Sequence, residues 1–369
     1  MSRRNAFLSF LRTHAITLTA AGAAGISFCF SPATAWYQAI DWRTLNLLFC
    51  LMFVVAGMRS CALFRTLAAT LLKGQQRYRP LAHILVQLTF FLSMLITNDV
   101  ALLALTPFAI YLLDSLNLRD RIPGLIVLQT VAANLGSMAT PVGNPQNLFL
   151  YTAFEIAPLD FFWAMVPITL IGALLLLLLT HLLKDAPLNT FETPALPQMP
   201  RQISHYLILF VICLCAVFRV LSDWVPFGII IIYALLFARP ILRKVGYGLL
   251  LTFICFFVFS GNLAQITAIR ELLTGFLEHH TQATAAITSQ LLSNVPAAIL
   301  LEPFTTDWKG LLFGTDIGGF GTPIASLASL ISLGIYLKEP DAKIGHYLIL
   351  FTLINLLFLL VLSIGSCFL

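Results

Sequence analysis

Two short polar motifs interrupt apolar stretches of the chain and carry side chains suited to binding chemistry. The first is Thr97-Asn98-Asp99 and the second is Ser293-Asn294-Val295. An Asn amide both donates and accepts hydrogen bonds, and the hydroxyl before it can do the same. These groups suit a small oxyanion together with a hard cation. We therefore expect Asn98 and Asn294 to contact a bound solute.

A stretch rich in Gly and Pro follows each Asn further along the chain. Residues 134–144 read NLGSMATPVGN and residues 316–326 read DIGGFGTPIAS. A Gly, the Thr-Pro pair and a polar residue at each end occupy the same positions in both stretches. Proline lacks a backbone donor and glycine loosens a helix, so neither stretch can form a continuous helix facing lipid. We expect each to break a spanning helix where it lines a polar cavity.

The two halves of the chain therefore repeat each other with two fixed offsets. Pro-Phe begins nine residues after the Asn of each first motif. The offset is 196 residues at the Asn98 and Asn294 motifs and 182 at the broken helices, because one connecting loop is shorter. Residues related by these offsets are called matched residues below.

A broken helix exposes N–H groups at one half-helix end, which attract anions, and carbonyl groups at the other, which can coordinate Na⁺. The predicted solute-binding residues are Thr97, Asn98, Thr140, Pro141, Asn144, Ser293, Asn294, Thr322, Pro323 and Ser326. The predicted coupling-ion residues are Asn98, Asp99, Asn134, Gly136, Gly143, Asn294, Asp316 and Gly318. Any one of these side chains could instead cap or join helices, but their duplication favours a binding role.

Three acidic residues lie in otherwise apolar segments: Asp99, Glu302 and Asp316. Ionisable groups inside a membrane are costly and are functional candidates by default. No Lys or Arg is expected beside them, so a proton or a metal cation should be their partner. Asp99 could alternatively cap the helix that starts at its motif, and Glu302 could lie at the outer interface.

The composition places the chain in a membrane. It has 369 residues, of which 59% are hydrophobic and only 10% are charged, whereas soluble domains are about 25% charged. Such a chain cannot cover itself with polar surface, so a soluble enzyme is excluded. The small net charge of +5 and the scattered basic residues argue against nucleic-acid binding. The lipid bilayer is the expected partner.

The apolar pattern predicts an all-α polytopic membrane protein built from two inverted repeats, with about nine crossings plus two re-entrant hairpins. The first repeat spans 1–184, with a hairpin at 80–116 and a broken helix at 121–156. A cytoplasmic linker at 185–203 precedes the second repeat at 204–369, with a hairpin at 281–305 and a broken helix at 310–337. The other expected crossings are 15–30, 44–58, 161–183, 204–222, 225–240, 246–262 and 345–367.

The distribution of charge gives an orientation for this topology. Five crossings separate the hairpins, and an odd number makes them enter from opposite faces. Most of the 21 Lys and Arg residues then fall on one side, which the positive-inside rule makes the cytoplasm. We expect the cell inner membrane, a cytoplasmic N-terminus and an outer C-terminus. The first apolar segment could instead be a cleaved secretory signal.

Four stretches resemble the ion transporter superfamily, which includes divalent-anion:sodium symporters, citrate permeases, arsenite efflux permeases and sodium/proton antiporters. They are TNDVALLALTPF at 97–108, GNPQNL at 143–148, SNVPAAILL at 293–301 and GTPIASLASL at 321–330. The resemblance implies a secondary carrier, often a homodimer, in which a transport domain shifts against a scaffold. In the dicarboxylate branch each hairpin tip bears Ser-Asn-Thr, whereas Asp99 and Val295 replace that Thr here. Asn98-Asp99 looks more like the arsenite permeases, while GNPQN at 143–147 looks more like the anion permeases.

Two transport hypotheses and one alternative follow. The first is a carrier of a small anion coupled to Na⁺ or H⁺, with no cofactor beyond possible Na⁺. The second is H⁺-coupled efflux of arsenite or antimonite, or cation/proton antiport. A membrane scaffold or an intramembrane enzyme is disfavoured, because no catalytic motif is present and a scaffold does not need two broken helices.

Overall fold

A computed structural model describes residues 15–29, 33–188, 200–340 and 342–369. These residues form helices and no strands, apart from one isolated bridge between Arg77 and Pro187. The helices are α2 (Ala15–Ser27), η1 (Ala33–Gln38), α3 (Trp42–Ser60), α4 (Leu63–Leu72), α5 (Tyr78–Leu95), α6 (Asn98–Ser115), η2 (Arg119–Arg121), α7 (Ile122–Met138), α8 (Pro145–Ala153), α9 (Pro158–His181), α10 (Ile203–Val217), α11 (Trp224–Phe237), α12 (Arg239–Leu242), α13 (Tyr247–Leu263), α14 (Thr267–Leu292), α15 (Asn294–Leu301), η3 (Glu302–Phe304), α16 (Trp308–Ile317), α17 (Leu327–Tyr336) and α18 (Ile344–Ser366).

Several helices have the length and composition of membrane spans. Among the described residues, α3, α9 and α18 are each long and apolar enough to cross a bilayer, and α4, α10, α11 and α17 are shorter apolar helices. Large apolar side chains on these helices are exposed, such as Trp163, of which 78% is accessible. Such surfaces suit contact with lipid. The chain is therefore an all-α polytopic membrane protein, while the number of crossings stays a prediction.

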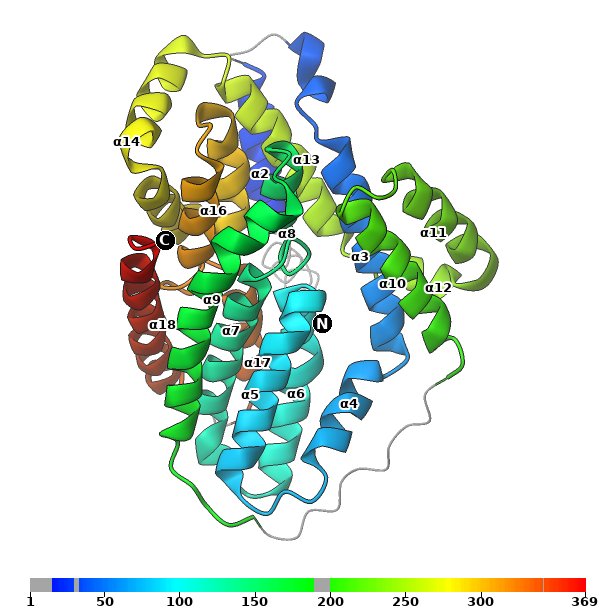
Figure 1. Ribbon diagram of the computed structural model, residues 1–369, viewed down its shortest axis with the longest axis vertical. Helices are drawn as coiled ribbons and strands as arrows, with labels where there is room; N and C mark the ends of the chain where they lie inside the picture. The colour runs from blue at the N-terminus through cyan, green and yellow to red at the C-terminus, as the bar shows by residue number, and fades with distance from the viewer. Residues whose placement is uncertain (1–14, 30–32, 189–199, 341) are drawn as a thin grey trace, which may run out of the picture.

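The helices form two groups (Figure 1). Helix α3 packs against α10, α11 and α12, whereas α7 packs against α5, α6, α9 and α18. Helix α8 contacts α3 of the first group and also α16, which packs against α18 of the second group, so α8 lies between the groups. Arg219, in the α10–α11 connection, joins them further by donating to the carbonyl oxygens of Glu155 at 2.9 Å and Tyr151 at 3.1 Å.

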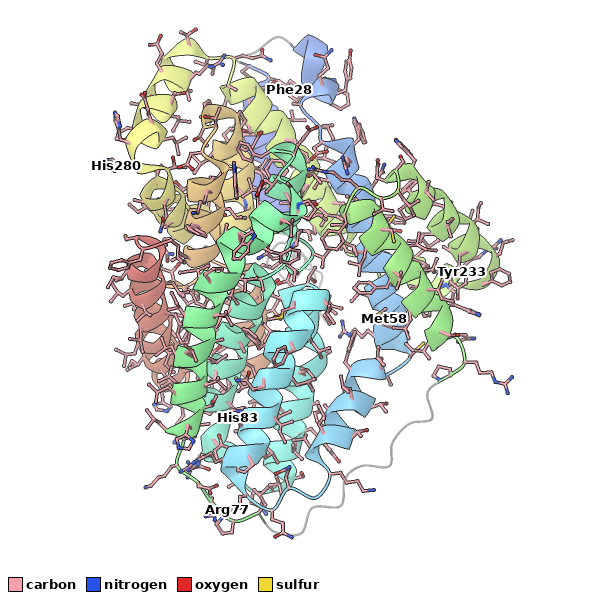
Figure 2. The ribbon with its side chains drawn as sticks, viewed as in Figure 1. Phe28, Met58, Arg77, His83, Tyr233 and His280 are labelled. Carbon is pink, nitrogen blue, oxygen red and sulfur yellow. The ribbon has the colours of Figure 1, made fainter. Side chains whose placement is uncertain are left out.

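Two helix–turn–helix pairs occupy the stretches predicted as hairpins. Helices α5 and α6 are joined only by Ile96 and Thr97. The second pair is the last part of α14 and α15, joined by Ser293, whose φ is +79°. Helix α14 bends at His280, whose φ of −141° is not helical (Figure 2). The arm that leads into the second turn therefore follows this bend.

Both Gly- and Pro-rich stretches interrupt helices. Residues 139–144 separate α7 from α8, and residues 318–326 separate α16 from α17. Pro145 starts α8, where its missing N–H is no loss. Asn144 caps the same helix, because its Oδ1 accepts from the backbone N–H of Asn147 at 2.8 Å.

Each broken helix packs closely against the first arm of its helix–turn–helix pair. A Cβ atom at Gly136 would lie 2.1 Å from the carbonyl oxygen of Phe90 in α5. A Cβ atom at Gly318, the matched glycine, would lie 2.8 Å from Ser289 Cβ in α14. Only glycine allows this approach, so these two positions hold the arms against the broken helices.

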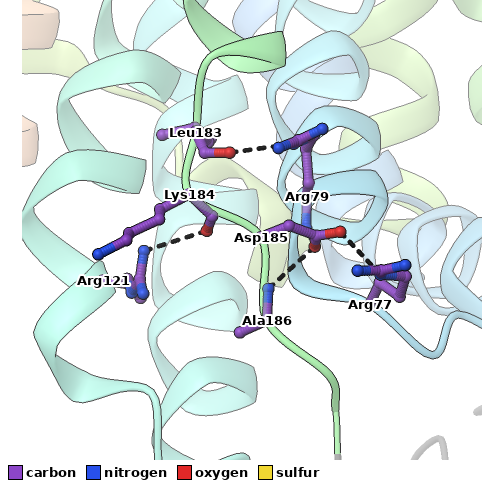
Figure 3. A network of polar contacts seen from close by, with 7 residues as sticks. All are labelled: Arg77, Arg79, Arg121, Leu183, Lys184, Asp185 and Ala186. Carbon is purple, nitrogen blue, oxygen red and sulfur yellow. Dashed lines mark hydrogen bonds and ion pairs between the residues drawn. The ribbon is translucent and has the colours of Figure 1, made fainter.

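A polar network fixes the chain where α9 ends beside the start of α5 (Figure 3). Asp185 accepts hydrogen bonds from the backbone N–H of Arg79 and of Ala186, both at 3.0 Å, and forms an ion pair with Arg77 at 2.7 Å. The N–H groups and the arginine charges hold the pKa of Asp185 below its usual value. Of the predicted linker at 185–203, residues 189–199 lie outside the described residues.

Candidate functional site

The two Asn motifs are joined to the two helix breaks by matching backbone hydrogen bonds. The N–H of Asn98 donates to the carbonyl oxygen of Gly143 at 3.0 Å, and the N–H of Asn294 donates to that of Ala325 at 2.9 Å. Gly143 and Ala325 are matched residues in the sequence. Each turn is therefore held against the break of its own half, immediately before the N-cap position of α8 or α17.

Side-chain hydrogen bonds then cross between the halves at Asn134. Its Oδ1 accepts from Asn98 Nδ2 at 3.1 Å and from Ser326 Oγ at 3.0 Å. Its Nδ2 donates to the carbonyl oxygen of Gly319 at 3.5 Å. Because Ser326 and Gly319 belong to the second break, Asn134 links the two breaks directly.

Asp316 makes the matching cross-connection. Its Oδ1 accepts from Asn144 Nδ2 at 2.9 Å and from Gln146 Nε2 at 3.1 Å. Asp316 is matched with Asn134, and Asn144 with Ser326. Each half thus places the polar residue that precedes its break against the residue at the N-cap position after the break of the other half.

Nearly all of these groups are shielded from solvent. Asp316 is 3% exposed, and its Oδ2 atom is buried without a hydrogen-bond partner in the described structure. Asn98, Asn294 and Asn144 are buried as well. A buried polar network of this kind is stabilising only when its members are satisfied, so an unpaired carboxylate oxygen marks a place where a ligand or proton can act.

A small pocket with a cavity volume of about 10 Å³, room for about one water molecule, lies between the two turns. The helices α6, α8, α15 and α17 all begin at it. The N–H groups of Asn98, Asp99, Asn294 and Val295 already donate within the protein. The dipoles of the four helices still place partial positive charge at the pocket, which favours oxygen-rich or anionic solutes. The lining residues are Asn98, Asp99, Pro145, Gln146, Leu249, Asn294, Val295, Ser326 and Leu327.

Other predicted site residues shape this pocket from a distance. Thr140 Oγ1 donates to the carbonyl oxygen of Met94 at 2.5 Å, and the matched Thr322 donates to that of Gln290 at 3.2 Å. Thr322 is also exposed. The predicted site residues that do not line the pocket are Thr97, Asn134, Gly136, Thr140, Pro141, Gly143, Asn144, Ser293, Asp316, Gly318, Thr322 and Pro323.

Two glutamines take part that the sequence reasoning missed. Gln146 lines the pocket and donates to Asp316. Gln290 Nε2 donates to the carbonyl oxygens of Gly318 at 2.6 Å and Phe320 at 2.8 Å, and its Oε1 accepts from Thr322 N–H at 2.8 Å. A polar side chain four residues before Asn294, inside an apolar arm, is the signal that could have identified Gln290.

Glu302 lies in a different pocket. Asp41 and Glu302 line it together with residues of α8 and α13, and its cavity volume is about 290 Å³. Asp41 Oδ2 accepts hydrogen bonds from Thr44 and Thr152. Within the described ranges no group of three or more His, Cys, Asp or Glu residues is arranged to hold a metal ion.

Comparison with known proteins identifies the family. The sequence model of the citrate transporter family matches residues 6–307. The chain is 33% identical over 328 residues to an uncharacterized transporter of Methanocaldococcus jannaschii, covering 88% of this chain and 89% of the relative. It is 32% identical over 321 residues to the inner membrane protein YbiR of Escherichia coli, covering 84% of each chain.

A shorter match involves a relative with a named cargo. The silicon efflux transporter LSI3 of Oryza sativa is 37% identical over 136 residues, which are 37% of this chain and 28% of that relative. The family model describes citrate transporters, and the relatives from Methanocaldococcus jannaschii and Oryza sativa are named transporters, so this chain is a transporter of a small molecule rather than an enzyme. Since the family model covers most of the sequence, this chain belongs to the citrate transporter family.

Proposed function

We propose that this protein is a secondary active transporter of the inner membrane that moves a small anion coupled to Na⁺ or H⁺. The observation that carries the proposal is the convergence of four helix N-termini on the pocket beside Asn98 and Asn294. Each N-terminus contributes roughly half a positive charge. Together they offer an anion a binding place without a basic side chain.

Two inverted repeats would provide alternating access to this pocket. In support, the bonds of Asn98 and Asn294 to their breaks correspond, and Asn134 and Asp316 exchange equivalent partners across the halves. Inverted repeats place such a site near the middle of the membrane. A transport domain containing α5 to α9 and α14 to α18 would then shift against a scaffold containing α3 and α10 to α12, in a homodimer with cytoplasmic N-termini.

The coupling ion would act through the acids at the two breaks and turns. Asp99 lines the pocket, and Asp316 accepts a hydrogen bond from Gln146, which also lines it. Binding of a cation or proton would neutralise these carboxylates, so that an anion could enter without repulsion. Asn98, Asn134 and Asn294, with the glycines at 136, 143 and 318, would hold the ion site in shape.

A second candidate function is H⁺-coupled efflux of arsenite or antimonite. One observation favours it: the helices α6, α7, α8, α15 and α17 contain no Lys, Arg or His. A solute without charge would not need such a residue. The partial match to a silicon efflux transporter points in the same direction.

Transport into proteoliposomes tests the proposal. Purified protein would be reconstituted and supplied with radiolabelled citrate or arsenite, with an inward Na⁺ gradient, a pH gradient or neither. The anion proposal predicts accumulation of citrate, and the second candidate predicts accumulation of arsenite, in each case only when a gradient is present. Accumulation that ignores both gradients, or no transport of either solute, would contradict both.

A further inference from the structure

The pocket between the two turns is closed in this structure. Its cavity volume of about 10 Å³ holds about one water molecule, so a solute can reach Asn98 and Asn294 only when neighbouring side chains move. The cavity beside Asp41 and Glu302, called the Glu302 cavity below, has a volume of about 290 Å³. That volume approaches the lower limit of small-molecule sites, roughly 300 Å³. The relation between these two spaces therefore bears on how a solute enters.

Helix α8 lines both spaces with one face. Gln146 lines the pocket, and Phe149 and Ala153 further along the same helix line the Glu302 cavity. Residues at these spacings share a face of an α-helix. The two spaces therefore lie one beyond the other along α8, about 5–10 Å apart at a rise of about 1.5 Å per residue.

Two more helices repeat this arrangement. On α15, Val295 lines the pocket and Ile299 lines the Glu302 cavity one helical turn later. On α13, Leu249 lines the pocket and Phe257 lines the Glu302 cavity two turns later. Helix α15 packs against both α8 and α13. The shortest way from the Glu302 cavity to the pocket therefore runs between these three helices.

Two phenylalanine rings block this way where α8 meets α13. The ring centroids of Phe149 and Phe257 are 5.3 Å apart, and the two side chains are only 3% and 4% exposed. Phe253, one turn nearer the pocket on α13, is fully buried and contacts Phe257 at a centroid distance of 5.8 Å. Pro303, which lines the Glu302 cavity beyond the end of α15, is exposed. The cavity thus reaches the surface at one end and ends on aromatic rings at the other.

The contact between Phe149 and Phe257 is suited to breaking and re-forming. It joins α8, which belongs to the transport domain proposed above, to α13, which does not. Separation of two aromatic rings leaves no polar group unpaired, unlike the separation of a buried hydrogen bond. A shift of α8 against α13 would therefore part the rings at little cost.

We propose, resting on the function proposed above, that the Glu302 cavity is the vestibule through which the solute reaches the pocket and that the contact between Phe149 and Phe257 is its gate. When α8 shifts against α13, the rings separate and the vestibule joins the pocket. The two phenylalanines control the access of the solute and do not hold it.

Cysteine labelling tests the vestibule without requiring transport. Ala153→Cys reports on the vestibule and Val295→Cys on the pocket, each in a full chain that also carries Cys29→Ser, Cys215→Ser and Cys367→Ser, since these three cysteines are not buried. A positively charged, membrane-impermeant methanethiosulfonate, whose charge suits the two acidic side chains of the vestibule, is applied to each face of sealed vesicles. We expect it to label Ala153→Cys from one face, and Val295→Cys far more slowly from that face. No labelling of Ala153→Cys from either face would overturn the vestibule.

Removal of a ring tests the gate. Phe149→Ala should raise the labelling rate of Val295→Cys from that face by about tenfold, the upper end of what loss of one aromatic pair produces. Phe257→Ala carries the same expectation if Phe149→Ala does not fold. Phe227→Ala is the matched control, because Phe227 pairs with Phe49 at 5.6 Å and lines neither space. An unchanged rate, or an equal rise with the control, would overturn the gate.

Cross-linking tests whether the rings separate during transport. A chain with Phe149→Cys and Phe257→Cys would be joined by a short bifunctional methanethiosulfonate and released by a reducing agent. We expect gradient-driven uptake of radiolabelled citrate or arsenite, whichever the wild type accumulates, to stop on cross-linking and to return on reduction.

The control pair is Phe49→Cys with Phe227→Cys, which joins α3 to α11 inside the proposed scaffold and should leave uptake unchanged on cross-linking. Uptake that persists after Phe149→Cys is joined to Phe257→Cys would refute the gate. Absence of gradient-driven uptake by the wild type would refute the carrier instead, and the labelling rates would still decide the vestibule and its gate.

Discussion

Asn144 donates a hydrogen bond from Nδ2 to Asp316 Oδ1 over 2.9 Å, although the two residues belong to different halves of the sequence. The orientation of the amide is fixed, because its Oδ1 accepts from the backbone N–H of Asn147. One side chain thus caps α8 and stabilises the buried acid at the end of α16. This contact is where the two broken helices depend on each other.

Replacing Asn144 by Asp separates these two roles. Aspartate caps a helix as well as asparagine does, but it cannot donate to Asp316 and adds a like charge. We expect Asn144→Asp to destabilise the protein by about 1–3 kcal/mol or more, the cost of leaving a buried polar group unsatisfied. Melting temperature measures the loss, and an unchanged value would show that the cross-contact contributes nothing.

The close approach at Gly136 and Gly318 predicts sensitivity to a single methyl group. Gly136→Ala would push a Cβ atom into the backbone of α5, so we expect a loss of about 1–3 kcal/mol, typical of overpacking. Gly318→Ala should behave alike. Gly124→Ala, also in α7, is the control, since its nearest neighbour would be Leu350 Cδ2 at 3.8 Å. Equal stability of Gly124→Ala and Gly136→Ala would contradict this packing.

Gln290 should control the shape of the second break. Gln290→Glu keeps the acceptor for Thr322 N–H but places an oxygen against the carbonyl oxygens of Gly318 and Phe320. We expect solute affinity to fall by about tenfold, with a lower melting temperature. Gln282→Glu on the same helix is the control, because its partner Ser366 can donate as well as accept. If both variants bind the solute equally well, the hydrogen bonds of Gln290 to the second break do not affect solute binding.

The network at Asp185 predicts a dependence of stability on acid pH. The pKa of Asp185 is lowered in the folded state, first by the N–H of Arg79 and then by the N–H of Ala186 and the charges of Arg77 and Arg79. The stabilisation that ionised Asp185 contributes is therefore fully present above about pH 4, the usual pKa of an Asp side chain. It is lost as the pH falls through the lowered pKa of the folded state. Melting curves of the wild type and Asp185→Asn should converge in strong acid. A constant difference at every pH would contradict the network.

Much of this architecture follows from the sequence because its signals are local. The two breaks occur where glycine and proline interrupt the helices, and Asn144 caps the helix that follows the first of them. The contacts of Gln146 and Gln290 could not be predicted, since they depend on how segments far apart in sequence meet. The bend at His280 has no proline to announce it. The roles of the site residues and the inverted topology stay predictions.

The central claim is that one pocket between Asn98 and Asn294 carries the transported solute. Uptake into proteoliposomes under an inward Na⁺ or pH gradient tests it most directly, with wild type, Asn98→Ala and Asn294→Ala reconstituted in equal amounts. Neither substitution changes an apolar surface, so both variants should insert normally. We predict gradient-driven uptake by the wild type and its loss in both variants. Wild-type uptake in both variants would place the site elsewhere.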